Sequence, residues 1–117
     1  MTRLLLTRRA TLDLIEIEDY SIKTWGTRTA EGYIAKFQTA FDLLRASPDL
    51  LRPVPEFSAQ LLFYRVERHW IVAHRTGDAV FVLTIRHGSM DIPKRLAELE
   101  PLLTQEVEIL AHRMHKP

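Results

Sequence analysis

Apolar side chains at helical spacing predict a helix from Arg8 to about Lys23. Thr7, directly before this segment, can accept a hydrogen bond from the free backbone amides of the first turn. Gly26 follows the segment, and glycine is the residue that most often ends a helix. The apolar or small positions that recur every three or four residues are Ala10, Leu14, Ile17 and Ser21.

A second apolar stripe of the same period predicts another helix, which starts at Thr27 or Thr29. We expect it to end at Ser47-Pro48, because proline disfavours helical geometry in the residue before it. Since Gly26 is the only breaker between the two segments, they are predicted to form a helical hairpin. The stripe consists of Ala30, Tyr33, Ile34, Phe37, Ala40, Phe41 and Leu44.

Past a proline-containing loop at residues 48–58, runs of β-branched and aromatic residues predict strands. Gly77 supplies the backbone freedom of a hairpin turn between the last two of them. Near the N-terminus, Leu4–Leu6 is a strand candidate that is too short to be stable unless it is paired centrally in a sheet. The three later strands are predicted at Leu61–Glu67, Trp70–Arg75 and Val80–Arg86.

These elements predict an α+β fold: an N-terminal strand, a helical hairpin and a three-stranded antiparallel β-sheet, followed by C-terminal helices. The C-terminal helices are expected at Ile92–Leu99 and Leu102–Met114. The last helix is too short to be stable alone, so its apolar stripe needs a cover. Its own sheet is the first expectation, and a partner or another copy is the second. We interpret residues 1–100 as one domain and residues 101–117 as its helical extension.

Composition narrows the class of protein. The chain has 117 residues, 46% hydrophobic and 26% charged, which is typical of one soluble globular domain. It has no cysteine, and its N-terminus lacks the apolar run of a signal peptide or membrane span, so we expect a cytoplasmic protein without membrane contact. The net charge of +1 gives no argument for nucleic-acid binding. No cofactor motif is present.

Histidines offer no predicted metal site. His69 and His74 lie five residues apart in a strand region, so their side chains fall on opposite faces. At the end of the last strand, His87 is a candidate acid or base because its pKa lies near neutrality. The structural alternative is that His87 bonds the departing chain, that Arg86 pairs with Asp91 or Glu67, and that Asp91 caps the helix expected at Ile92.

In this arrangement of elements, several short motifs follow one another in a family-specific order. They are Ala10-x-x-Asp13-Leu14-x-x-Ile17-x-x-Tyr20, Trp25-Gly26, Ala30, Tyr33, Leu43–Pro48, Tyr64-Arg65-Val66 and Ile85-Arg86-His87-Gly88-Ser89-Met90-Asp91-Ile92. Through these residues the sequence resembles the RelE/ParE superfamily of bacterial toxins, and the ParE-like branch in particular. The resemblance covers roughly residues 3–96.

The resemblance implies the toxin of a type II toxin–antitoxin pair. Its partner would be a cognate ParD-like antitoxin with a ribbon-helix-helix N-terminus and a helical tail, in a hetero-oligomer. ParE-type toxins poison DNA gyrase without catalysis of their own, whereas RelE-type toxins cleave messenger RNA on the ribosome. An inactive binding module is a third alternative.

Site residues follow from the resemblance and from the charge pattern. The candidates for antitoxin binding are Asp13, Glu16, Tyr20, Arg65 and Arg75. The candidates for target binding are Arg86, Asp91, Lys94 and Arg95. If the chain is instead a nuclease, its catalytic groups are expected to be Arg65, Arg86 and His87, since cleavage needs an acid or base and cations for the phosphate. Beyond Tyr64 the chain has no tyrosine, and its only lysines there are Lys94 and Lys116, which favours the gyrase-binding alternative.

Overall fold

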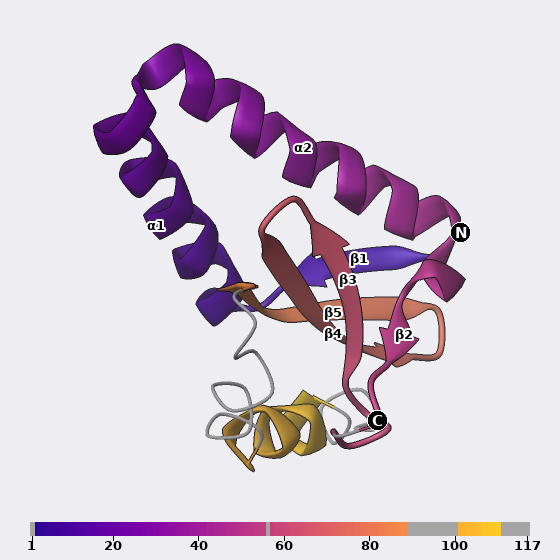
Figure 1. Ribbon diagram of the computed structural model, residues 1–117. Helices are drawn as coiled ribbons and strands as arrows, with labels where there is room; N and C mark the ends of the chain where they lie inside the picture. Colours follow the sequence, from indigo (N-terminus) through magenta and orange to yellow (C-terminus); the bar gives the residue numbers. More distant parts are fainter. Residues whose placement is uncertain (1, 56, 89–100, 111–117) are drawn as a thin grey trace.

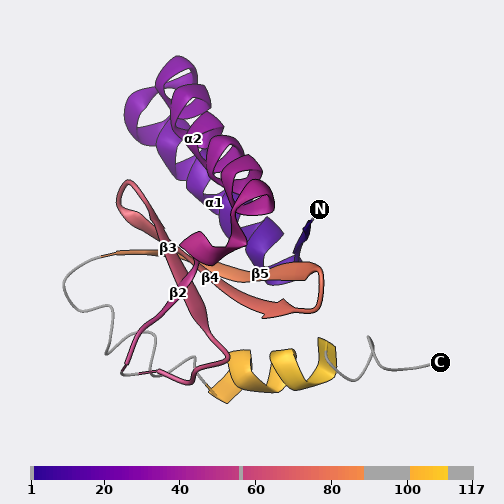
Figure 2. The ribbon, with the colours of Figure 1, turned by 90° about the vertical axis from the view of Figure 1, so that its right-hand side faces the viewer.

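In the computed structural model, a β-sheet carries a helical hairpin on one face and a further helix on the other (Figures 1 and 2). The structure describes residues 2–55, 57–88 and 101–110. Among these residues the sheet has five strands in the order β1-β5-β4-β3-β2. The strands are β1 (Arg3–Leu6), β2 (Arg52–Pro53), β3 (Leu62–Val66), β4 (His69–Thr76) and β5 (Ala79–His87). The helices are α1 (Arg8–Trp25), α2 (Thr27–Ala46), the 3-10 turn η1 (Pro48–Leu50) and a helix at residues 101–110.

Residues at the helix ends determine where the helical hairpin begins and where it turns. The Thr7 side chain accepts a hydrogen bond from the Ala10 amide at 3.2 Å, which caps α1 as predicted. Gly26 ends α1 with a φ of 91°, a backbone conformation that favours glycine, and its N–H donates to the Ile22 carbonyl. The chain therefore reverses between α1 and α2 within a single residue. Both helices lie on the same face of the sheet (Figure 2).

Tight hairpins connect the antiparallel strands. Glu67 and Arg68 join β3 to β4, and Glu67 adopts a positive φ of 54°. Gly77, with a φ of 57°, lies in the turn from β4 to β5, as expected. A register shift at Val72/Ala73 marks a β-bulge in the β4–β5 ladder. Side chains that face each other in this register share one face of the sheet.

Each face of the sheet has its own apolar core. The core beneath the hairpin includes Phe37, Phe41 and Leu44 of α2 and Ile71 of β4. On the far face, Leu103 and Val107 of the 101–110 helix pack with Phe63, Val72, Phe81 and Leu83. The last helix therefore covers its own sheet, which confirms the first expectation for its apolar stripe.

The sequence prediction needs two corrections. The sheet has five strands, because β2, a strand of only two residues at Arg52–Pro53, pairs antiparallel with Phe63 and Leu62 of β3. This strand was not predicted, because proline argues against a strand. Leu4–Leu6 is not central: β1 lies at the sheet edge and pairs in parallel with β5, with Leu4 buried beneath the hairpin. The helix expected at Ile92–Leu99 and the end of the helix expected at Leu102–Met114 lie outside the described residues. Within the described ranges, no helix is both long and apolar enough to cross a membrane.

Candidate functional site

A groove of about 1040 Å³ opens between the helical hairpin and the end of the sheet where β5 leaves it. Its walls come from α1, α2, the β3–β4 turn and the last residues of β5. The groove is lined by Asp13, Glu16, Ile17, Tyr20, Ser21 and Trp25 of α1, by Thr29, Tyr33 and Lys36 of α2, and by Glu67, Arg68, His69, Ile85, Arg86 and His87. It is larger than a second hollow between α2 and β3, whose volume is about 420 Å³.

A chain of rings connects the hairpin tip to the sheet along this groove. Trp25 lies 6.1 Å from Tyr20 and 6.2 Å from Tyr33, measured between ring centroids. Tyr33 Oη and His69 Nδ1 are 2.7 Å apart and share a hydrogen bond. The His69 ring in turn meets the His87 ring edge-on, with centroids 5.2 Å apart. Exposed aromatic side chains thus adjoin a partly buried polar pair.

Burial sets the protonation of this pair. Desolvation lowers the pKa of His69 to about 4, and the nearby His87 contributes to this lowering. Burial also raises the pKa of Tyr33. Both groups are therefore neutral at pH 7, and their hydrogen bond holds α2 against the start of β4.

Charged groups of both signs surround the groove. Lys36 Nζ contacts Glu67 Oε1 at 2.8 Å, and this hydrogen bond lowers the pKa of the Glu67 carboxyl. Both side chains are about half exposed, so the pair contributes little to stability. Among the described residues Glu16, Arg68 and Arg86 take part in no ion pair. These three charges are therefore available to a ligand.

Asp13 has a structural role that the sequence did not reveal. Its carboxylate accepts hydrogen bonds from the buried Thr84 hydroxyl and, at 3.1 Å, from the Ile85 amide. These bonds join α1 to β5 at the base of the groove. The side chain predicted to bind an antitoxin is thus already engaged within the chain, while Glu16 and Tyr20 remain exposed beside it.

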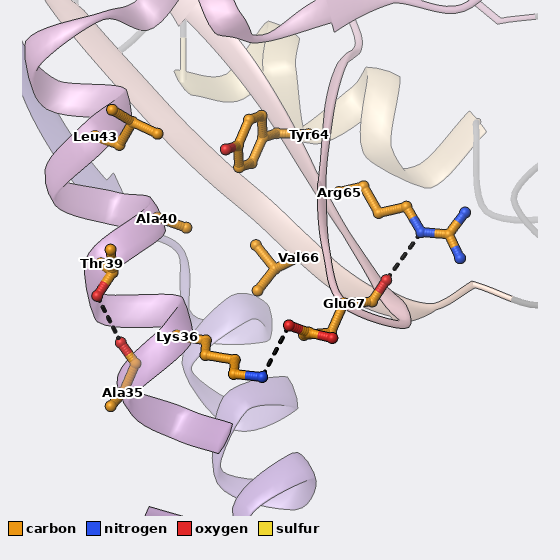
Figure 3. A pocket seen from close by; sticks show the side chains of 9 residues that line it. All are labelled: Ala35, Lys36, Thr39, Ala40, Leu43, Tyr64, Arg65, Val66 and Glu67. Carbon is orange, nitrogen blue, oxygen red and sulfur yellow. Dashed lines mark hydrogen bonds and ion pairs between the residues drawn. The ribbon is translucent and has the colours of Figure 1, made fainter. Parts of the chain in front are cut away.

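The other two predicted antitoxin residues lie elsewhere. Arg65 donates to the Glu67 carbonyl at 2.9 Å, and its guanidinium carbon lies 5.5 Å from the centroid of the Trp70 ring. It lines a second, shallower hollow of about 420 Å³ between α2 and β3 (Figure 3). Arg75 pairs with Asp49 at 2.7 Å, away from both hollows. Asp91, Lys94 and Arg95 lie outside the described residues.

The three groups expected for a nuclease are divided between the two faces of the sheet. Arg86 is in register with Trp70, which is in register with Arg65, so these side chains form one cross-strand row. His87 is in register with His69, whose ring contacts Tyr33 and Phe37 under the hairpin. Successive strand residues point to opposite faces, so His87 faces away from the Arg65 row. Arg86 also borders the groove at the end of β5.

Sequence reasoning missed several groove residues. Trp25 and Tyr33 belong to the quoted family motifs but not to the predicted site, and their aromatic spacing around Gly26 was the available signal. Lys36, Arg68 and His69 gave no local signal, because they meet at the groove only through the pairing of distant elements. Arg86 forms no ion pair with Glu67, which contacts Lys36 instead, and the other expected carboxylate, Asp91, lies outside the described residues.

Comparison with known proteins gives the family. Residues 4–92 match the model of the "ParE toxin of type II toxin-antitoxin system, parDE". The chain belongs to the ParE toxin family. The helix at residues 101–110 lies beyond the matched range.

Curated relatives and a solved structure agree with this assignment. Toxin ParE of Escherichia coli is 32% identical over 99 residues, which are 84% of this chain and 96% of the relative. Toxin ParE1 of Caulobacter vibrioides is 29% identical over 86 residues, 74% of this chain and 88% of the relative. A solved structure, "Chromosomal ParDE TA system from P. aeruginosa", shares the fold with a TM-score of 0.68 at 19% identity, covering 76% of this chain and 98% of that chain.

Acidification is expected to lower the free energy of unfolding between about pH 6.5 and pH 4. The pKa of His69 is about 4 in the folded chain and about 6.5 when unfolded, so the unfolded state binds more protons in this window. The contribution of neutral His69 to the free energy of unfolding is therefore complete above about pH 6.5 and decreases as the pH falls toward about 4. The full shift corresponds to about 3 kcal/mol, and solvent screening of the half-buried ring reduces the expected loss to about 1–2 kcal/mol.

Urea titrations at neutral pH and near pH 4.5 measure this loss. His69→Phe keeps a ring in place but cannot be protonated, so its stability should depend less on pH than that of the wild type. His74→Gln is the matched control, because His74 contacts the Gln60 carbonyl away from the groove. Equal pH dependence in the wild type and His69→Phe would contradict the assignment.

Proposed function

We propose that this ParE-family toxin acts by binding and not by catalysis, that its groove holds the helical tail of a cognate ParD-like antitoxin, and that its target is DNA gyrase. The groove between the hairpin and the sheet is the observation that carries this proposal. It offers aromatic contacts and unpaired charges on a rigid frame. Both components would work in the cytoplasm.

The composition of the groove supports a helical ligand. Tyr20 and Trp25 are exposed at its mouth, and aromatic side chains are the usual anchors of protein interfaces. An amphipathic helix binds such grooves through apolar residues spaced three and four apart. Glu16 on one side and Arg68 on the other would pair with charges of either sign along its polar face. The likeness to the P. aeruginosa protein, which belongs to a ParDE system, supports an antitoxin partner of this kind.

The arrangement of the basic residues favours binding over RNA cleavage. An in-line attack needs its acid, base and cations around one phosphate. Here Arg65 belongs to the row with Trp70, whereas His87 faces His69 on the other side of the sheet. Gyrase therefore remains the proposed target, with Arg86 and the predicted residues Asp91, Lys94 and Arg95 as candidate contacts.

The target is tested by inducing the chain in growing bacteria and assaying the purified protein with gyrase. We expect growth arrest, inhibition of supercoiling and accumulation of cleaved DNA. Ribosome-dependent cleavage of messenger RNA without any effect on gyrase would overturn the proposed target. Absence of growth inhibition would favour an inactive binding module.

The antitoxin site is tested by calorimetric titration with the cognate ParD-like antitoxin of this proposal. Trp25→Ala is expected to weaken binding about tenfold or more, because truncation of an aromatic anchor removes a large contact area. Leu43→Ala is the matched control, since Leu43 is an exposed apolar residue of α2 that lines the second hollow instead. A loss with Leu43→Ala and none with Trp25→Ala would move the antitoxin tail to that second hollow.

A further inference from the structure

Helix α1 carries a second apolar stripe on the side opposite its core contacts. Leu12 and Ile15 are each 49% exposed and Ile22 is 38% exposed, whereas Ala10 and Ser21 are buried. At 3.6 residues per turn, the three aliphatic residues lie within about 40° of one line along the helix, together with Arg8 and Asp19. We call these five residues the outer stripe: Arg8, Leu12, Ile15, Asp19 and Ile22.

The two charges of the outer stripe have no ion-pair partner in the described part of the chain. Other exposed charges do find partners there, as Arg45 does with Asp42 and Arg75 with Asp49. The three aliphatic side chains likewise remain exposed although α1 is otherwise amphipathic. Water therefore surrounds an apolar stripe that has a cation toward one end and an anion toward the other.

We propose that the outer stripe is a homodimer interface, in which α1 packs antiparallel against α1 of a second copy. The order Arg8, Leu12, Ile15, Asp19 is complementary to its own reverse. With the helices antiparallel, Arg8 lies opposite Asp19 of the second copy, and Leu12 lies opposite Ile15 of the second copy. Both pairs have the same midpoint, between residues 13 and 14, which is the place of a two-fold axis in an isologous interface.

Charge complementarity selects this occupant. A parallel pairing would set Arg8 against Arg8 and Asp19 against Asp19, whereas the antiparallel pairing gives two opposite-charge contacts around four aliphatic side chains. A partner of other chemistry would need its own matching order of cation, apolar pair and anion. The second copy supplies that order by symmetry.

The interface is small and separate from the groove. A helix of 18 residues is about 27 Å long, so a single helix pair buries an area at the low end of protein interfaces. We therefore expect a concentration-dependent dimer with a dissociation constant on the order of tens of micromolar. Ile17 and Ser21, which line the groove, lie on the other side of α1, so dimer formation leaves the groove open.

Sedimentation equilibrium of the full chain, from about 5 to 500 µM at low salt, tests the proposal. The wild type is expected to shift from monomer to dimer across this range. Ile15→Glu places two carboxylates at the centre of the interface and should abolish the shift. Arg8→Glu and Asp19→Arg each replace two attractions by two repulsions and should weaken dimerisation about tenfold. All three positions are exposed, so the fold is retained, and circular dichroism verifies it.

A mixture of the two charge variants gives the decisive measurement. In a heterodimer of the Arg8→Glu variant with the Asp19→Arg variant, the new carboxylate at position 8 of one chain faces the new guanidinium at position 19 of the other. At the second contact, the unchanged Asp19 faces the unchanged Arg8. Both contacts join opposite charges, so the mixture should dimerise more tightly than either variant alone. Arg52→Glu and Glu31→Arg carry the same charge changes at exposed positions on β2 and α2 and should dimerise like the wild type. A wild type that is monomeric at every concentration, or a mixture no tighter than its components, would overturn the proposal. A dimer insensitive to Ile15→Glu would place the interface elsewhere and also overturn it.

Discussion

Replacement of Leu103 by alanine is expected to lower the free energy of unfolding by about 2–5 kcal/mol. Leu103 is only 2% exposed and packs with Val107 of its own helix and with Phe81 and Leu83 of β5. Truncation would leave a cavity between the helix and the far face of the sheet. Urea denaturation followed by circular dichroism measures the loss.

The neighbouring residue provides a matched control for this prediction. Leu102 is 52% exposed in the same turn of the helix, so Leu102→Ala should change the free energy of unfolding by no more than about 0.5 kcal/mol. The two substitutions remove the same atoms from adjacent positions. Equal, small effects would show that the helix does not pack on the sheet in solution.

The helix at residues 101–110, which lies beyond the range matched by the ParE family model, covers an apolar face of the sheet. Without residues 101–110, the apolar side chains Phe63, Val72, Phe81 and Leu83 would form a large exposed patch on the far face. The mixed sheet of this chain is apolar on both faces, so it needs a layer on each side. The hairpin supplies one layer and the C-terminal helix supplies the other.

Local chemistry is what made the helical hairpin and the antiparallel strands predictable. Thr7, Gly26 and Gly77 determine a cap, a helix end and a turn within a few residues of sequence. The predicted ends of the helices and strands that the structure describes in full lie within about two residues of the observed ones. The edge position of β1 was not predictable in this way, because it depends on pairing with β5, far away along the chain.

The groove was only partly predictable for the same reason. Glu16, Tyr20, Arg86 and His87 are candidates on the family motifs and the charge pattern, and the structure brings them to one groove. Arg65 and Arg75 are candidates on the same grounds, but the packed structure directs them to Trp70 and Asp49. A single sequence shows a stripe or a strand end clearly, whereas a contact such as that of Tyr33 with His69 exists only after the elements have packed.

The second large loss of stability is expected at Asp13, whose carboxylate accepts hydrogen bonds from Thr84 and Ile85 of β5. Asp13→Ala is expected to lower the free energy of unfolding by about 2–4 kcal/mol, because the buried Thr84 hydroxyl and the Ile85 amide lose their acceptor. Glu18→Ala is the control on the same helix, since Glu18 is exposed, and it should have an effect below about 0.5 kcal/mol.

A double-mutant cycle with Thr84→Val separates the hydrogen bond from the rest of this effect. Thr84→Val removes the donor and keeps the shape, so Asp13→Ala should be less costly in its presence, with a coupling energy of about 1 kcal/mol or more. Because these bonds hold α1 against β5 at the base of the groove, Asp13→Ala should also weaken binding of the antitoxin, whereas Glu18→Ala should not. Urea denaturation of the four proteins of the cycle measures the coupling. Additive effects of the two substitutions would contradict a direct bond between the two side chains and leave the position of α1 to packing alone.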